Sequence, residues 1–283
     1  MGITESLNIE AQFKKATAYV LEGKSLAAIQ IYKKLIGVKE SERNATIKLA
    51  DLYDQAGQTN SAIELFYKYL ENNSDDEEII KLVSYFLVRN SLFSEAEKFI
   101  HKFNDVKDEN MDFLRGIVNF HTGKYAVTQN LFSEFVDDYS DSELLPNVQF
   151  YLAKIYFLDS SYDNALKSIK HSIRLKKNNA EFHKLEAEIY FKKEMYYHAN
   201  ESINKALKLN PSVVEWKHFQ IKILILLDEI KKVKEKLDHF IDESDSSAEI
   251  LHLIGNWYLK NKDVPEANKY FEKAKGITAQ DSK

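Results

Sequence analysis

The side chains that could carry out chemistry do not stand in the spacings that catalysis or metal binding needs. Of the eight histidines, none is followed four residues later by another, so no helix carries a two-histidine metal site. The chain has no cysteine, which excludes thiolate ligands, disulfides and a cysteine nucleophile. Glycine patterns that cradle phosphates and the Gly-x-Ser-x-Gly pattern of a serine nucleophile are absent as well. We therefore expect no catalytic residue, no metal and no cofactor.

What remains is a set of aromatic, aliphatic, lysine and histidine side chains that could hold a partner by apolar contact and ion pairing. The nine candidates are Lys81, Tyr85, Phe113, Ile117, Phe150, Lys154, Lys184, His218 and Lys222. Whether they form one surface depends on the elements that carry them.

Composition limits the class of protein. Hydrophobic residues make up 44% of the 283 residues and charged residues 29%, which is typical of a folded domain. The net charge of −5 gives no basic surplus for binding nucleic acid. The longest apolar run, residues 223–227, is far shorter than a membrane span, and the first ten residues do not form a secretory signal. We expect a cytoplasmic protein, or a periplasmic one if a signal sequence has been removed.

A repeat of about 34 residues runs through the chain. Its most regular mark is a position, here called the slot, that carries a small residue followed four residues later by a large apolar one. The eight slots are Ala28, Ala62, Ala96, Thr128, Ala165, Ala199, Val233 and Ala267. Successive slots lie 34, 34, 32, 37, 34, 34 and 34 residues apart, so self-similarity at one period is the strongest pattern in the sequence.

Each repeat has a second small position twelve residues before its slot, and three residues later a position that we call the ring position. The ring positions hold Tyr19, Tyr53, Leu87, Asn119, Tyr156, Tyr190, Leu224 and Tyr258. Small residues let two helices approach closely, and an aromatic side chain fills the space beside them. Glycine-containing turns, such as that at Gly23, fall between the two halves. Each repeat therefore predicts a helix, a tight turn and a second helix.

This pattern resembles the tetratricopeptide repeat family, whose inter-repeat proline Pro211 also matches. The resemblance implies an all-α, right-handed superhelical solenoid of about eight helix-turn-helix units over residues 9–276. Residues 1–8 would be an N-terminal extension and residues 277–283 a C-terminal tail. Charged residues on the last helix suggest that it caps its own end; alternatively, this end docks on another copy or on a partner. The fourth and seventh repeats are degenerate, with Arg115 and Thr128 in one and Ile221 and Val233 in the other.

Family geometry implies that residues fifteen and eleven before each slot point into a concave groove. The nine candidates fall at these positions, with an apolar strip in the middle repeats and a basic to neutral strip in the later ones. They suggest a protein or peptide partner with apolar anchors and acidic residues. Phe120, Phe157 and Phe191 could extend the surface. Alternatively, individual aromatic residues pack between neighbouring helices. No pair of residues matches the two-carboxylate clamp that binds chaperone tails.

Two other features allow two interpretations each. The 37-residue step is either a three-residue loop insertion or a sign of the longer repeats that bacterial envelope-assembly proteins carry. The segment 221–227, apolar on nearly every side, is either a buried internal helix or an interface near Ile225 and Leu226 with a partner or a second copy.

The sequence thus favours a non-catalytic protein-interaction scaffold that binds a peptide segment or protein in the groove, in a bacterial multiprotein assembly. The alternative is a helical-repeat RNA-binding protein, with lysines on phosphates and aromatic rings on bases. An enzyme on a helical scaffold is a third hypothesis, which would need a closed pocket holding an acid or base. Homo-oligomerisation stays open.

Overall fold

The computed structural model describes residues 3–103, 107–229 and 248–280, and within these ranges every regular element is helical. Contacts between residues divide the chain into two units, 1–135 and 136–283. Each is described by itself below. The second helix of the seventh repeat, with its slot Val233, lies outside the described residues.

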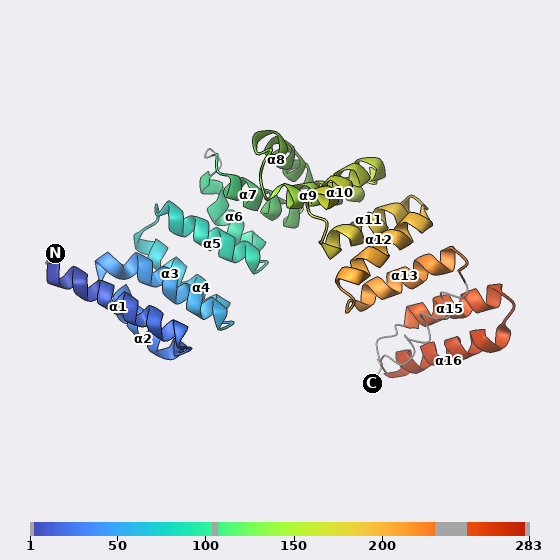
Figure 1. The fold of residues 1–283 in the computed structure, drawn as a ribbon, viewed down its shortest axis with the longest axis horizontal. Coiled ribbons are helices and arrows are strands. Elements are labelled where there is room, and N and C mark those ends of the chain that lie inside the picture. Colours follow the sequence, from blue (N-terminus) through green and yellow to red (C-terminus); the bar gives the residue numbers. More distant parts are fainter. Residues whose placement is uncertain (1–2, 104–106, 230–247, 281–283) are drawn as a thin grey trace. The chain divides into compact units, whose positions relative to one another are not determined.

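The first unit is a series of helical hairpins (Figure 1). Its elements are α1 (Ile3–Leu21), α2 (Ser25–Ile36), α3 (Lys39–Gln55), α4 (Thr59–Asn72), α5 (Glu77–Arg89), α6 (Phe93–Ile100), a 3-10 turn η1 (His101–Phe103), α7 (Glu109–His121) and α8 (Tyr125–Asp138), whose last residues pass into the second unit. Each helix packs on the one before it in sequence from α2 to α7, and α5 also contacts α7. The predicted extension is partly helical, because α1 begins at Ile3.

The second unit continues the same alternation. Its elements are α9 (Leu145–Leu158), α10 (Tyr162–Leu175), α11 (Ala180–Lys192), α12 (Tyr196–Leu209), α13 (Val214–Leu226), α15 (Ala248–Lys260) and α16 (Val264–Gln280). Helices pair as α9 with α10, α11 with α12 and α15 with α16. The architecture is therefore an all-α helical repeat, as the periodicity predicts.

The small positions are the points at which two helices of a hairpin meet. Among the slots inside the described residues, all seven are completely buried, including the polar Thr128. At the second small position, a Cβ on Gly116 would collide with the ring of Phe132, and one on Gly255 with the ring of Phe271. The hairpins are therefore closed by contacts that leave no room for a larger residue.

The turn inside every repeat needs one residue in the left-handed region of backbone space. This residue always lies five positions before the slot: Gly23, Gly57, Ser91, Gly123, Ser160, Glu194, Asp228 and Lys262 all have φ between 57° and 81°. Only three of the eight are glycine, so the other five adopt a conformation that disfavours a Cβ. The turn geometry is thus set by the two packed helices and not by glycine alone.

We expect Glu194→Gly and Lys262→Gly each to raise the free energy of unfolding by about 0.5–1 kcal/mol, because glycine removes the Cβ strain. Urea unfolding followed by circular dichroism measures the change. Gly57→Ala is the matched control and should lower stability, since a Cβ there meets open space and only the backbone is strained. Equal effects of both kinds of substitution would contradict this account.

The 37-residue step appears as a longer connection between repeats. Six residues, 139–144, join α8 to α9, whereas four residues, 176–179, join α10 to α11. Helix α9 also has 14 residues where α11 has 13. The extra residues therefore lie at the junction of two repeats, as the loop-insertion interpretation requires, and the contact boundary at residues 135 and 136 falls beside them.

Asp76 joins three elements of the first unit. It caps α5 by accepting the backbone N–H of Ile79 at 3.1 Å, and it accepts Nε of Arg43 at 2.7 Å and the hydroxyl of Tyr69 at 2.9 Å. The Arg43 guanidinium is the main reason that the pKa of Asp76 lies below its ordinary value. Burial and the same carboxylate raise the pKa of Tyr69 to about 12.

Asp76→Ala should lower the free energy of unfolding at pH 7 by about 2 kcal/mol, because a helix cap and charged hydrogen bonds are lost together. Folding lowers the pKa of Asp76, so its stabilisation is complete above the unfolded-state pKa, about 3.9, and is lost as the pH falls through the lower folded-state value. The stability difference between wild type and variant should therefore shrink in acid. Urea titrations from pH 7 downwards measure it, and a constant difference would contradict the assignment.

The outer face of the last helix is charged. On α16, Lys275 pairs with Glu272 at 2.6 Å, and Lys269 pairs with Glu266. Self-capping of this end stays a prediction. Among the described residues, no helix is long and apolar enough to span a membrane.

Candidate functional site

Four of the predicted groove residues lie on α5 and α7, the first helices of the third and fourth repeats. Tyr85 on α5 is exposed over 54% of its surface. Phe113 on α7 is half-buried, with its ring 6.0 Å from that of Phe132 and 6.5 Å from that of Phe135, and Ile117 is buried. In the first unit, Tyr85 thus offers a free ring, whereas Phe113 and Ile117 mostly close the hairpin of α7 and α8.

Lys81, the fourth of these residues, connects two repeats. Its Nζ lies 2.5 Å from Oδ2 of Asp108, the residue that caps α7, and 5.4 Å from the centre of the Phe103 ring. Burial alone would raise the pKa of Asp108. Hydrogen bonds from the Lys81 amine and the backbone N–H of Met111 outweigh this effect, and the pKa of Asp108 lies below its ordinary value. Part of the positive charge expected in the groove is therefore used to hold α5 against the start of α7.

The second unit carries the remaining five residues on α9, α11 and α13. Phe150 packs against Phe182 at 5.0 Å between ring centres, and Nζ of Lys154 lies 4.6 Å from the Phe150 ring. Burial lowers the pKa of Lys154, although the carboxylates of Glu181 and Glu188 oppose the shift. The Lys154 amine is therefore partly removed from water and lies over the Phe150 ring.

Charges on this face of the second unit are mixed. Lys184 pairs with Glu188 at 2.8 Å on α11. On α13, His218 is half-buried and Lys222 is exposed, with its Nζ 5.7 Å from the ring of Phe191. The predicted basic strip is therefore interrupted by acidic side chains, and Lys222 is its most accessible cation.

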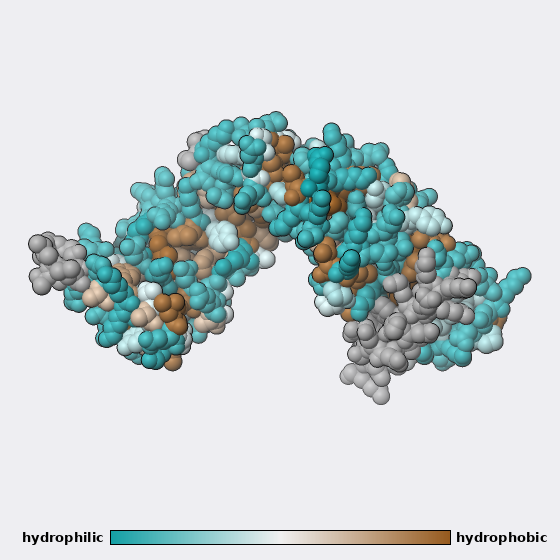
Figure 2. Space-filling model, viewed as in Figure 1, coloured by the Kyte–Doolittle hydropathy of each residue, from teal (hydrophilic) through white to brown (hydrophobic). Residues whose placement is uncertain are grey.

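Segment 221–227 is buried in part, and the interface near Ile225 and Leu226 stays a prediction. Ile221, Ile223 and Leu224 are buried, so this part is an internal helix. Lys222 is exposed and Leu226 is 48% exposed, so the end of α13 also reaches the surface. Figure 2 shows further apolar patches that interrupt the mainly hydrophilic surface of both units.

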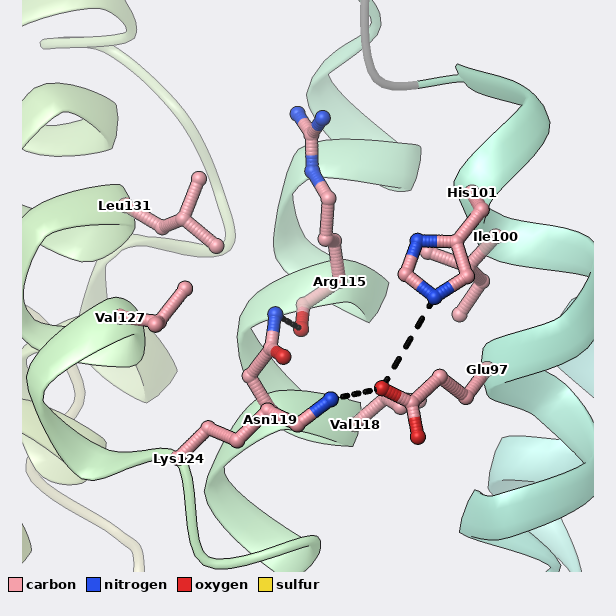
Figure 3. Close-up of a pocket in the computed structure, with 9 residues that line it drawn as sticks. All are labelled: Glu97, Ile100, His101, Arg115, Val118, Asn119, Lys124, Val127 and Leu131. Atoms are coloured by element: carbon pink, nitrogen blue, oxygen red, sulfur yellow. Dashed lines mark hydrogen bonds and ion pairs between the residues drawn. The ribbon is translucent and has the colours of Figure 1, made fainter.

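A pocket that the sequence analysis did not identify lies in the first unit, with a volume of about 330 Å³. Figure 3 shows its lining. Glu97 and Ile100 of α6 and His101 of η1 lie on one side, and Val127 and Leu131 of α8 lie on the other. Arg115, Val118 and Asn119 of α7 and Lys124, which precedes α8, lie between them. The Lys124 amine donates to Glu97, and Nε2 of His101 lies 3.9 Å from the same carboxylate. The pocket thus combines an apolar base and wall with a charged rim.

Arg115, Val118 and Asn119 lie on the side of α7 opposite to Phe113 and Ile117, since a helix turns about 100° per residue. The pocket and the predicted groove are therefore different surfaces of the same helix. In the described part of the chain, no group of three or more histidine or acidic side chains could hold a metal ion.

Comparison with known proteins identifies one of the repeats. Residues 45–76, which run from α3 to the cap of α5, match the family model described as tetratricopeptide repeat. These residues are therefore identified as one tetratricopeptide repeat. Within the described residues, the other repeats share its left-handed turn, and all of them except the seventh, whose slot is not described, share its buried slot. No curated protein sequence matches the chain.

Solved structures share the tetratricopeptide fold. The C-terminal part of a repeat protein from Cytophaga hutchinsonii is 16% identical, with 80% of this chain and 93% of that chain covered and a TM-score of 0.62. PilF of Pseudomonas aeruginosa is 18% identical, with 76% and 97% covered and a TM-score of 0.59. YrrB, titled a protein with an unusual peptide-binding site, is 16% identical, with 67% and 97% covered and a TM-score of 0.50. These likenesses concern the fold.

Sequence reasoning missed the pocket although one signal for it was present. Asn119 stands at the ring position of the fourth repeat, where five other repeats of this chain carry tyrosine. The amide of Asn119 donates to the carbonyl of Arg115 at 2.9 Å and so folds back on its own helix. A short side chain at this position leaves space between neighbouring helices, which spacing alone did not reveal.

Lys81→Ala should lower the free energy of unfolding by about 1 kcal/mol, because the ion pair with Asp108 and the contact with Phe103 are both lost. Tyr85→Ala on the same helix should change it by less than about 0.5 kcal/mol, since an exposed side chain contributes little to folding. Urea unfolding of both variants measures the difference. The reverse order would mean that Tyr85 is structural and Lys81 is available for binding.

Proposed function

We propose that this protein is a non-catalytic scaffold whose first-helix face binds a segment of a partner protein. The observation that carries the proposal is the exposed ring of Tyr85, which lies on a face where the neighbouring candidates Phe113 and Ile117 are packed. Exposed aromatic side chains on a firm surface are effective anchors in protein interfaces. Arg89, which pairs with Asp54, is one turn beyond Tyr85 on α5 and adds a polar border.

In the second unit, Lys154 and Lys222 support a partner segment that carries acidic residues. Lys154 lies on the Phe150 ring and Lys222 near the Phe191 ring, so each amine is presented beside an apolar surface. A carboxylate next to an apolar side chain would complement this arrangement. The neighbouring Glu181 and Glu188 disfavour a strongly anionic partner such as RNA.

The test is affinity capture from a native lysate with the full chain as bait, followed by quantitative mass spectrometry. The face variant carries Tyr85→Ala and Lys222→Glu. The control carries Tyr197→Ala and Lys208→Glu, which make the same chemical changes at exposed residues of α12, a second helix of its repeat. Circular dichroism must first show that both variants fold.

We expect a protein captured by wild type and control but lost from the face variant. Its binding should weaken less than about tenfold between 50 and 200 mM salt, whereas a nucleic acid that contacts many lysines would lose about 10³-fold or more. Capture that is equal for both variants would refute the proposed face. Loss of the captured set on nuclease treatment would favour the RNA alternative.

A further inference from the structure

The ring position has a defined surrounding in the repeats that carry tyrosine there. Tyr53 lies under Nζ of Lys33 at 5.8 Å, and Tyr190 lies under Nζ of Lys170 at 5.5 Å. In both repeats the lysine comes from the second helix of the preceding repeat, five residues after its slot. A cation above the ring is therefore a recurrent feature of the ring position.

The second helix of the same repeat supplies the other contacts. The ring of Tyr190 lies 5.0 Å from that of His198, one residue before the slot. The ring of Tyr258 stacks on that of Tyr270, three residues after the slot, at 5.3 Å. Tyr190 and Tyr258 are both buried. Tyr190 is thus enclosed between two successive second helices, by Lys170 of α10 and His198 of α12, and Tyr258 packs on the second helix of its own repeat.

The fourth repeat keeps this surrounding but lacks the ring. His101 occupies the position of Lys33 and Lys170, Val127 that of His198, and Leu131 that of Tyr270. All three line the 330 Å³ pocket, and Asn119 stands at the ring position among them (Figure 3). The pocket is therefore a ring position that its own repeat leaves unfilled.

The size and chemistry of the pocket suit an aromatic side chain. An apolar cavity of about 150 Å³ is enough to bind benzene, and this pocket is larger and open. Ile100 and Val118 are buried beneath it, and Val127 is 48% exposed on its wall. Glu97, Lys124 and His101 at the rim can contact a polar edge such as a phenol hydroxyl.

We propose that this pocket receives an aromatic side chain, tyrosine in the first place, from a partner protein. The incoming ring takes the place that the chain's own tyrosine takes in five other repeats. Because the pocket lies on the opposite side of α7 from Phe113 and Ile117, this contact is separate from the proposed first-helix face. One molecule therefore has two surfaces for protein segments.

The first experiment uses p-cresol, the isolated tyrosine side chain, and the full chain. Ligand-observed NMR should show binding with a dissociation constant of about 1 mM, and weaker binding of the non-aromatic 4-methylcyclohexanol. Asn119→Tyr should raise the melting temperature by about 3 °C and weaken p-cresol binding at least tenfold, because the chain fills its own pocket. Asn130→Tyr, at an exposed residue of α8, is the matched control and should keep binding.

The second experiment identifies the source of the ring. A displayed library of random twelve-residue peptides is selected on wild type and depleted on Asn119→Tyr. Selected peptides should share an aromatic residue whose replacement by alanine abolishes binding, and they should still bind the Tyr85→Ala, Lys222→Glu variant. Peptides that bind the proposed first-helix face would bind Asn119→Tyr but not the Tyr85→Ala, Lys222→Glu variant. The two proposals can therefore fail independently.

Three results would overturn the inference. One is absence of p-cresol binding to wild type, and another is equal binding by wild type and Asn119→Tyr. The third is that the selected peptides contain no aromatic residue on which binding depends. This result would contradict the proposal that a protein segment supplies the ring.

Discussion

Close contact between a small residue on one helix and a ring or aliphatic chain on the next is the interaction on which every hairpin of this protein depends. Alanine at the slots is fully buried, and Gly116 and Gly255 leave room only for the rings of Phe132 and Phe271. Helices that approach so closely can be joined only by a tight turn. The left-handed residue is therefore present in all eight turns even where it is Glu194 or Lys262.

Repeats that contact only their neighbours can tolerate local exceptions, and this chain has several. Thirteen residues before the slot, the second and fifth repeats bury Leu49 and Leu152, whereas the sixth buries Glu186. The Glu186 carboxylate accepts a hydrogen bond from the hydroxyl of Ser202 at 2.7 Å. Burial opposes ionisation of Glu186, but His183 and Ser202 outweigh it and its pKa is lowered. This exception does not change the fold, because Glu186 finds its partners within its own hairpin.

The fourth repeat is the exception that is not compensated. It carries Arg115 at the register of Leu49 and Asn119 at the ring position, and its pocket lies where five other repeats carry a tyrosine ring. The same helix presents Phe113 and Ile117 on its other side. Degeneration of one repeat thus creates a surface that a regular array lacks, while the regular repeats maintain the helices that surround it.

The sequence by itself determined the helical hairpins of the described residues and their order. The 34-residue period follows from residues that must be small or aromatic for two helices to meet, and such residues are visible without a structure. Even the irregular 37-residue step marked the longer connection at 139–144. Helical periodicity indicates that residues one turn apart share a side of their helix, whereas the choice of the first-helix face came from the family resemblance.

Only the tertiary structure decided which of those residues are available. The rings of Phe113 and Phe150 pack against those of Phe132 and Phe182 from other helices, whereas Tyr85 is 54% exposed. Lys81 is tied to Asp108, 27 residues away, and the pocket at Asn119 needs walls from the third repeat as well as the fourth. Exposure, charge pairing and empty volume depend on neighbours from other repeats, whereas a periodic pattern describes each repeat alone.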